Sequence, residues 1–314
     1  MKKVVTIGGG TGSYVVLRGL KEFPLDITAI VSMFDSGGSS GVLRDEFGVL
    51  PPGDVRRCLV ALSDGKRAEI LRDLFNFRFE NGDKLKGHSF GNLLLVALRE
   101  IYKSDIEAIR KASELLDIKG RVLPVSLDKS ELHAVLENGE EIIGETNIDV
   151  PKHDGSMKIK NVFLEPAAGI FGETANAVRD ADLIVIGPGD SYSSIIPNLL
   201  VKGMPEALKE SRGKKVFVCN LMSKWGETHD FEASDIAGEL LRYSNLPTFD
   251  YALCNTGEMD AELLAAYAKE NKRPIHCDEK LKNHATKIVT GDFFSRADIA
   301  RHDSEKVAKA ISEL

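Results

Sequence analysis

The sequence predicts an α/β protein with a Rossmann-like, doubly wound and mostly parallel sheet, into which a small β-rich segment is inserted. The first observation is a β-branched run at residues 3–7 that ends in glycines and precedes helical spacing at 13–23 and an apolar run at 27–31. Strand, glycine turn, helix and strand in this order open a doubly wound sheet. The second observation is the recurrence of apolar runs, suited to strands buried on both faces. These runs lie at 183–186, 216–219 and 249–254.

A different pattern fills residues 121–164, where short β-like runs alternate with turns. Asn138-Gly139 lies between two such runs, which is a strong hairpin signal. We therefore expect one domain over 1–314 with a β-rich insertion at 121–164. Helical spacing and capping residues predict helices at about 54–62, 67–77, 89–102, 106–116, 168–179 and 304–314.

Composition excludes several classes of function. The formal charge of −7 makes the 314-residue chain a poor partner for nucleic acid or an anionic membrane surface. No run reaches the roughly 18 apolar residues of a membrane span. The four cysteines form no CxxC pair, which favours a reducing compartment and thus the cytoplasm. The sequence leaves the oligomeric state open, including a homo-oligomer.

The first strand leads into Gly8-Gly9-Gly10-Thr11-Gly12. Glycines there let backbone N–H groups approach an anion, and the helix that follows directs its positive end to the same point. The pattern is neither GxGxxG nor a Walker A loop. It predicts a phosphate site, and the alternative is a tight strand-to-helix turn without a ligand.

A polar loop follows the second strand and carries Gly37, Gly38, Ser39 and Ser40. Ligands of open sheets bind beyond the carboxyl ends of the strands, so we expect this loop to offer hydroxyl and N–H donors. A flexible linker is the alternative. The carboxylates that flank this loop are Asp35 and Asp54.

Asp35 and Asp54 could bind Mg²⁺ beside phosphates, or hydrogen-bond a sugar hydroxyl. For Asp54, capping of the helix at 54–62 is the competing interpretation. Mg²⁺ is the one cofactor that these residues suggest.

Positive charge close to the loop comes from Arg44, Arg56 and Arg57, whose planar guanidinium groups suit phosphate oxygens. Surface ion pairs with Asp45 or Glu46 are the alternative, favoured for Arg57. His88 stands at the start of a strongly apolar helix, for which Ser89 is the expected cap. There it could contact a ligand or act as a base, and packing or capping is the alternative.

Gly187-Pro188-Gly189 repeats the arrangement of a buried strand followed by a glycine turn. It predicts a second phosphate-sized cradle on the far side of the sheet's crossover. Two such turns in one sheet suggest a diphosphate that bridges the switch point. No GxSxG elbow is present, so spacing alone assembles no nucleophilic triad.

These motifs together resemble the YvcK-type gluconeogenesis factors of the CofD-like superfamily, in order and over nearly the whole chain. The resemblance implies a Rossmann-like core and a cytoplasmic bacterial protein. Family members of this type bind UDP-sugars, notably UDP-N-acetylglucosamine, and are linked to gluconeogenic growth, cell shape and cell-wall precursor supply. The matching segments are 8–12, 35–41, 43–46, 51–56, 87–93, 187–189, 194–200, 219–222, 226–228 and 301–303.

The resemblance adds Asn92, Asn198 and Asn220 to the binding candidates, and places Tyr251 and Arg301 where family members contact the UDP-sugar. Core packing is the alternative for Tyr251, and an ion pair with Asp303 for Arg301. The implied function is a nucleotide-sugar-binding regulator without turnover. The CofD branch supplies the alternative, a phosphotransferase that moves a phospholactyl-type group from a nucleoside-diphosphate donor to a deazaflavin alcohol with Mg²⁺.

Three departures from the family pattern bear on the ligand. Ser36 replaces the second aspartate of the loop, which weakens a metal site and so the transferase interpretation. Asp190 and Ser191 follow the second glycine turn, where a carboxylate would repel phosphate unless it points away or binds metal. Lys224-Trp225 replaces Gln-Pro before Gly226.

Overall fold

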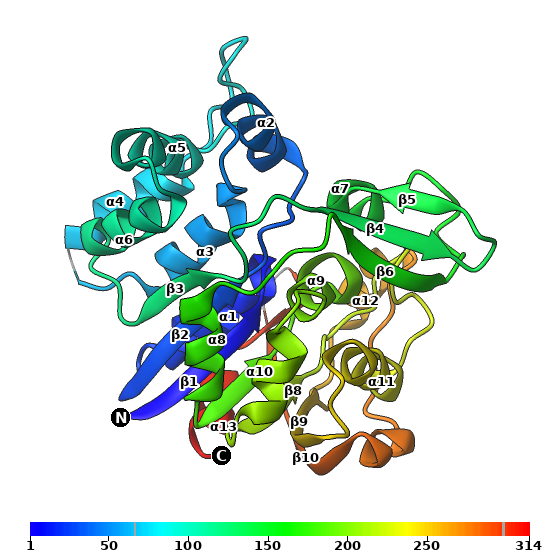
Figure 1. Cartoon of the computed structure of the whole chain (residues 1–314). Coiled ribbons are helices and arrows are strands. Elements are labelled where there is room, and N and C mark those ends of the chain that lie inside the picture. Colours follow the sequence, from blue (N-terminus) through cyan, green and yellow to red (C-terminus); the bar gives the residue numbers. More distant parts are fainter. Residues whose placement is uncertain (66, 297–298) are drawn as a thin grey trace.

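The computed structural model describes residues 1–65, 67–296 and 299–314. At its centre lies a sheet of seven strands in the order β10-β9-β8-β7-β1-β2-β3, in which all neighbours run parallel (Figure 1). The Rossmann-like α/β prediction is therefore confirmed. The strands are β1 (Lys2–Gly8), β2 (Leu25–Val31), β3 (Arg121–Pro124), β7 (Leu183–Ile186), β8 (Lys214–Val218), β9 (Phe249–Asn255) and β10 (Ala285–Gly291).

The sheet is buried because its central strands are apolar on both faces. All four residues of β7 are buried, as are the last three of β8. Helices cover the two faces, with α1 packed against α3 and α13, and with α10 packed against α8 and α11. The helices are α1 (Gly10–Leu20), α3 (Pro52–Leu62), α8 (Gly172–Arg179), α10 (Met204–Glu210), α11 (Ala233–Ser244) and α13 (Ser304–Ser312).

Between β2 and β3 the chain forms a lobe of helices, seen at the upper left of Figure 1. The lobe begins with α2, which starts at Gly38, so most of the predicted 36–41 loop is instead the first turn of a helix. Ser39, Ser40 and Gly41 are buried there. Together with α3, the lobe consists of α2 (Gly38–Phe47), α4 (Arg67–Asn76), α5 (Phe90–Tyr102) and α6 (Asp105–Leu115).

The β-rich insertion is present but begins later than predicted. Residues 121–124 form β3, which pairs with β2 at the edge of the main sheet. The buried apolar side chains of β3 complete the core of that sheet. The insertion proper is the antiparallel sheet β5-β4-β6 with a short helix, at the right of Figure 1. Its elements are β4 (Glu131–Leu136), β5 (Glu141–Ile143), α7 (Glu145–Asp149) and β6 (Ile159–Glu165).

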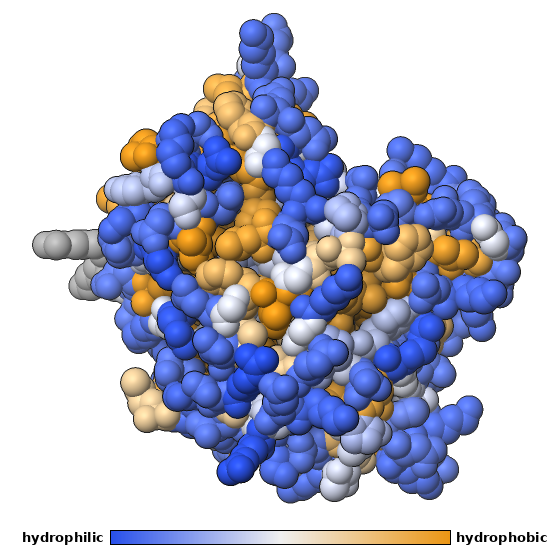
Figure 2. All heavy atoms as spheres, viewed as in Figure 1, coloured by the Kyte–Doolittle hydropathy of each residue, from blue (hydrophilic) through white to orange (hydrophobic). Residues whose placement is uncertain are grey.

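The direction of strand addition reverses between β1 and β7, because β2 and β3 follow on one side of β1 and β7 to β10 on the other. This is the topological switch point, at which ligands bind in open sheets. Figure 2 shows the surface indented between the helical lobe and the insertion, with apolar residues gathered below them. The remaining elements are η1 (Ser191–Ile195), α9 (Ile196–Leu199), α12 (Ala261–Ala268), η2 (Glu279–Asn283), β11 (Phe294–Ser295) and β12 (Arg301–His302).

None of the helices in the described part of the chain combines the length and the apolar character that a membrane crossing requires.

Candidate functional site

A cleft of about 590 Å³ lies at the switch point. Its floor is the turn after β1, and its walls come from the start of α2, from α3, from α7 and from the segment after β7. Thirteen predicted site residues line it, namely Gly9, Gly10, Thr11, Gly12, Asp35, Gly37, Gly38, Ser39, Ser40, Asp54, Arg56, Asn92 and Gly189.

The floor is shaped for close backbone approach. Gly10 begins α1 with φ of +65°, a conformation that favours glycine. A Cβ on Gly12 would stand 2.6 Å from the carbonyl carbon of Pro188, so the two glycine turns touch across the switch point. The first turn of α1 contains no acidic residue of its own, and the carboxylate of Asp54 from α3 lies against this positive helix end, so close that a Cβ on Gly9 would overlap it.

Asp54 is not the N-cap of its helix. The helix begins at Pro52, and Asp54 instead points to the glycine turn, where the backbone N–H of Gly10 donates to its carboxylate. Burial raises the pKa of Asp54 to about 6, assisted by Asp35 and opposed by Arg57. Asp54 is therefore a buried carboxylate of the cleft.

Three arginines also line the cleft. Arg56 is buried, and its guanidinium donates to the side chain of Asn92 and to the carbonyl of Phe75 over 3.1 and 3.2 Å. Burial lowers the pKa of Arg56 to about 10, which leaves it charged at neutral pH. Arg57, expected to pair with Asp45 or Glu46, lies 3.5 Å from Asp54 instead. Arg78 is the third.

Polar side chains hold the start of α2 against the start of α5 within the lobe. The hydroxyl of Ser39 lies 3.0 Å from Nδ1 of His88 and accepts from Nδ2 of Asn92 over 3.1 Å. The predicted cap is confirmed, since Ser89 Oγ accepts from the N–H of Asn92. His88 thus contacts the wall from behind rather than lining the cleft.

The wall formed by α7 adds carboxylates that the sequence did not reveal. Burial raises the pKa of Glu145 to about 8, assisted by Asp35, Asp149 and Asp54. Oδ1 of Asp35 accepts from the N–H of Gly37 over 2.8 Å. Although Ser36 replaces a carboxylate, Glu145 brings one to the same place. Carboxylates whose charges act on one another in this way are stabilised by a cation.

The second glycine turn, predicted to cradle a phosphate, is followed by backbone donors that bind a protein carboxylate. Glu227 accepts from the N–H groups of Tyr192 and Ser193 over 2.7 and 3.3 Å and from the Ser193 hydroxyl over 2.7 Å. The N–H of Gly189 donates to Oδ1 of Asn220 over 3.1 Å. Backbone donors at this turn are thus used internally.

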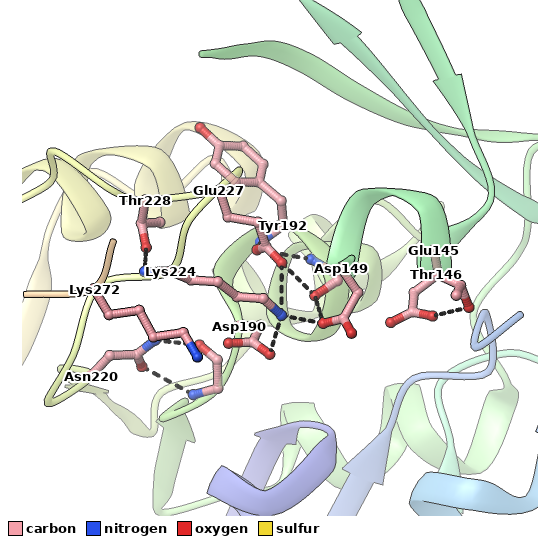
Figure 3. A network of polar contacts seen from close by, with 12 residues as sticks. Glu145, Thr146, Asp149, Asp190, Tyr192, Asn220, Lys224, Glu227, Thr228 and Lys272 are labelled. Carbon is pink, nitrogen blue, oxygen red and sulfur yellow. Dashed lines mark hydrogen bonds and ion pairs between the residues drawn. The ribbon is translucent and has the colours of Figure 1, made fainter. Parts of the chain in front are cut away.

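Lys224 stands beside this turn, and its ammonium contacts the carboxylates of Asp149, Asp190 and Glu227 (Figure 3). Nζ lies 2.7 Å from Oδ2 of Asp190. Asp190 and Lys224, which stand at two positions that depart from the family pattern, thus form an ion pair. The carboxylate at 190 is compensated by an ammonium rather than left to repel an anion.

Comparison with known protein families matches residues 4–294 to the model described as 2-phospho-L-lactate transferase CofD. The chain belongs to the CofD family. The gluconeogenesis factors of Halalkalibacterium halodurans and Bacillus subtilis are 44% and 41% identical to it, each over 99% of this chain and 96% and 98% of their own. These matches confirm the resemblance to YvcK-type members.

Solved structures agree with this assignment. A crystal structure of a protein from Bacillus halodurans superposes on this CofD-family chain with a TM-score of 0.94, at 43% identity and 99% coverage of both chains. A second crystal structure from the same organism, described as a member of the UPF0052 family, gives a TM-score of 0.93.

Several predicted residues lie just behind the cleft of this CofD-family chain. Gly8 ends β1, and Gly187 begins the second turn. Asn220 holds that turn from both sides, since its Nδ2 also donates to the carbonyl of Gly189 over 2.7 Å. Asn198 is buried and donates to the carbonyl of Ser194 over 2.8 Å. Their structural contacts support the cleft, and ligand contact stays a prediction.

Three other predicted residues lie away from the cleft. Arg44 pairs with Asp45 over 2.8 Å and lines a separate hollow beside the insertion. Tyr251 is half-buried on β9, with the ammonium of Lys287 6.0 Å from its ring. Arg301 is exposed in a groove on the α13 side of α1. No ion pair with Asp303 is found among the described residues, and Asp303 caps α13 instead.

Some of the lining residues that the sequence did not reveal come from two segments of the chain. The insertion contributes Glu145, Thr146 and Asp149 through α7, and the loop after β8 contributes Lys224. Their one sequence signal was the departure from the family pattern at Lys224. The remaining lining residues not predicted as sites are Ser32, Gly53, Arg57, Arg78, Val150, Asp190, Ser193 and Ser194.

Proposed function

We propose that the cleft binds a nucleoside-diphosphate sugar of the UDP-N-acetylglucosamine type, and that the protein acts in gluconeogenic growth through this binding. The observation that carries the proposal is the glycine turn at the N-terminus of α1 together with Arg56, Arg57 and Arg78 in one cleft at the switch point. Backbone N–H groups at a helix start and guanidinium groups are the donors that phosphate oxygens prefer.

The diphosphate of the ligand and the carboxylates of the cleft are both negatively charged, so a cation is needed to neutralise them. Asp35, Asp54 and Glu145 all line the cleft, and burial together with the neighbouring carboxylates raises the pKa values of Asp54 and Glu145. Oxygen donors of this kind suit Mg²⁺. We therefore infer that Mg²⁺ would bind beside these carboxylates together with the diphosphate, with one or two of them and the phosphate oxygens as its ligands.

The link to gluconeogenic growth is supported by the names of the relatives, which are called gluconeogenesis factors. A regulator that reports nucleotide-sugar supply would also connect carbon metabolism with cell shape and cell-wall precursors. Binding alone suffices for that role, so we propose no turnover.

Isothermal titration with UDP-N-acetylglucosamine, with and without Mg²⁺, tests this function. We expect a saturable signal that weakens when Mg²⁺ is removed and that free UDP suppresses. GDP and GDP-mannose serve as controls for the base. Absence of heat together with absence of competition would refute the proposal. Mass spectrometry of molecules released on denaturing the purified protein gives an independent identification.

The second candidate function is transfer of a phospholactyl-type group, as the name of the matched family model suggests. The specific observation in its favour is Asp54, whose pKa of about 6 suits a general base near neutral pH. In that reaction the acceptor alcohol forms a new O–P bond, the bond to the nucleoside monophosphate breaks, and Asp54 takes the hydroxyl proton.

Incubation with a guanosine-linked phospholactyl donor, a deazaflavin alcohol and Mg²⁺ tests the transferase candidate. Release of nucleoside monophosphate in step with product would support it. An unchanged donor, under conditions in which the nucleotide binds by titration, would leave the binding function as the better account.

A further inference from the structure

Lys224 lies among three carboxylates that belong to three separate segments. Asp149 ends α7 of the insertion, Asp190 follows β7, and Glu227 lies in the loop after β8. Their carboxylate oxygens lie within 4.8 Å of one another. Figure 3 shows the Lys224 side chain reaching between them, with Nζ 2.7 Å from Asp190 and 3.4 Å from Glu227 and in contact with Asp149.

Three convergent carboxylates are a ligand set typical of a divalent cation. Here an ammonium stands at the point where such an ion would bind. The side chain of Lys224 is only 18% exposed and that of Glu227 is fully buried, whereas those of Asp149 and Asp190 are 35% and 42% exposed. The charges of Lys224 and Glu227 therefore face one another away from bulk water. Burial opposes the ammonium charge, but Glu227, Asp190 and Asp149 raise the pKa of Lys224 above its ordinary value.

The surroundings of Glu227 fix the geometry of this pocket. Its carboxylate also accepts from the backbone N–H groups of Tyr192 and Ser193 and from the Ser193 hydroxyl. Ser193 Oγ lies 3.5 Å from Asp149 Oδ1 as well. Glu227 and, through Ser193, Asp149 thus keep contacts that do not depend on Lys224, whereas the carboxylate of Asp190 is bound by the lysine. We expect removal of the ammonium to leave Glu227 and Asp149 in place, with Asp190 close enough to complete the set.

We propose that Lys224 is a tethered cation that takes the place of a divalent metal ion at this wall of the cleft. It neutralises Asp149, Asp190 and Glu227 from within the chain. This group of carboxylates therefore needs no metal, and any metal requirement of the protein arises nearer the glycine turn, beside Asp35, Asp54 and Glu145. The inference concerns cation use alone and does not depend on which nucleotide the cleft binds.

An ordinary ion pair and a tethered cation differ in what happens when the lysine is lost. Loss of an ion pair lowers stability and creates no new affinity. Loss of a tethered cation exposes a preformed set of oxygen ligands, so the variant gains a divalent-ion site. A gain of binding is a readout that a merely structural role for Lys224 does not produce.

The test is titration of the full-length, EDTA-treated protein with Mn²⁺ alone, followed by electron paramagnetic resonance of the free ion. We expect Lys224→Ala to bind one Mn²⁺ per chain more than the wild type. The double variant Lys224→Ala/Asp149→Asn should lose this extra ion. Lys215→Ala is the matched control, because Lys215 is also partly buried but donates to the carbonyl of Ser211 away from the cleft. It should bind as the wild type does.

Equal Mn²⁺ stoichiometry and affinity in the wild type and in folded Lys224→Ala would overturn the proposal. Folding is checked by circular dichroism in the same buffer. If Lys224→Ala fails to fold in EDTA, Mn²⁺ should restore folding to it but not to Lys224→Ala/Asp149→Asn. Failure of Mn²⁺ to restore folding to the single variant would also overturn the proposal.

Discussion

The backbone N–H of Thr146 donates a hydrogen bond to Oγ of Ser36 over 3.1 Å. This contact joins α7 of the insertion to the loop after β2, and the two hydroxyls lie 3.3 Å apart beside it. At the other end of α7, Asp149 contacts Lys224. The short helix therefore spans the cleft, attached to one wall through Ser36 and to the other through Lys224.

We expect Ser36→Ala to loosen α7. The change leaves the N–H of Thr146, in the first turn of a helix, without its acceptor, which costs about 1 kcal/mol in unfolding free energy. Hydrogen exchange measured by mass spectrometry should show faster exchange at residues 145–150. Ser130→Ala is the control, since Ser130 bonds the carbonyl of Pro166 elsewhere. Unchanged protection at 145–150 would show that Ser36 does not hold the helix.

The raised pKa of Asp54 predicts how stability depends on pH. The folded-state pKa is about 6 and the ordinary value is 3.8, so the folded state binds a proton more tightly than the unfolded state does. Protonation of Asp54 therefore stabilises the fold at low pH, and this contribution is lost as pH rises from about 4 to 6. The shift corresponds to about 3 kcal/mol.

Asp54→Asn removes this pH dependence. In EDTA, its unfolding free energy relative to wild type should rise by about 3 kcal/mol between pH 4 and pH 7, measured by urea denaturation. Asp180→Asn, at an exposed aspartate, should show no such trend. A relative stability of Asp54→Asn that stays flat or falls over this range would contradict the assignment.

Local pattern predicted the sheet better than the helices that surround it. The strand at 183–186 was located to the residue, because a continuous apolar run stopped at Gly187. The segment from Gly38 was interpreted as a loop, since serine and glycine are weak helix formers. Burial of Leu43 and its neighbours in the lobe outweighs that propensity.

Only part of the site could be predicted, because local sequence patterns reveal only those residues that lie in or beside a motif. The glycine turn, Asp35 and Arg56 lie in or beside local motifs, so the sequence located them. Lys224 and Asp149 are 75 residues apart and meet only because the insertion folds over the switch point. No local spacing encodes such a contact.

Gly12 provides a test of the close approach between the two glycine turns. We expect Gly12→Ala to lower the free energy of unfolding by about 1–3 kcal/mol, because the new Cβ would overlap the backbone of Pro188. Gly172→Ala is the matched control, since a Cβ there meets nothing within 4 Å. Urea denaturation of both variants gives the comparison. Equal stability of the two would mean that the turns can separate without cost.

Arg56 and Arg44 allow a comparison between a buried guanidinium group in the cleft and a guanidinium group outside it. Arg56 is 7% exposed, and it bonds Asn92 and the carbonyl of Phe75 rather than a carboxylate. No ion pair of Arg56 is found in the part of the chain that the structure describes, so its charge is available to an anion. Arg44 is paired with Asp45 beside the insertion.

We therefore expect Arg56→Lys to weaken nucleotide-sugar binding at least about tenfold, a loss of roughly 1.4 kcal/mol. The lysine keeps the charge but loses the planar fork that meets phosphate oxygens and lobe acceptors together. Arg44→Lys should change affinity less than about twofold, since exposed pairs contribute little. Isothermal titration measures both, with thermal unfolding as a check that Arg56→Lys is folded. A folded Arg56→Lys with wild-type affinity would place the phosphates away from Arg56 and would favour Arg57 and Arg78 as their partners.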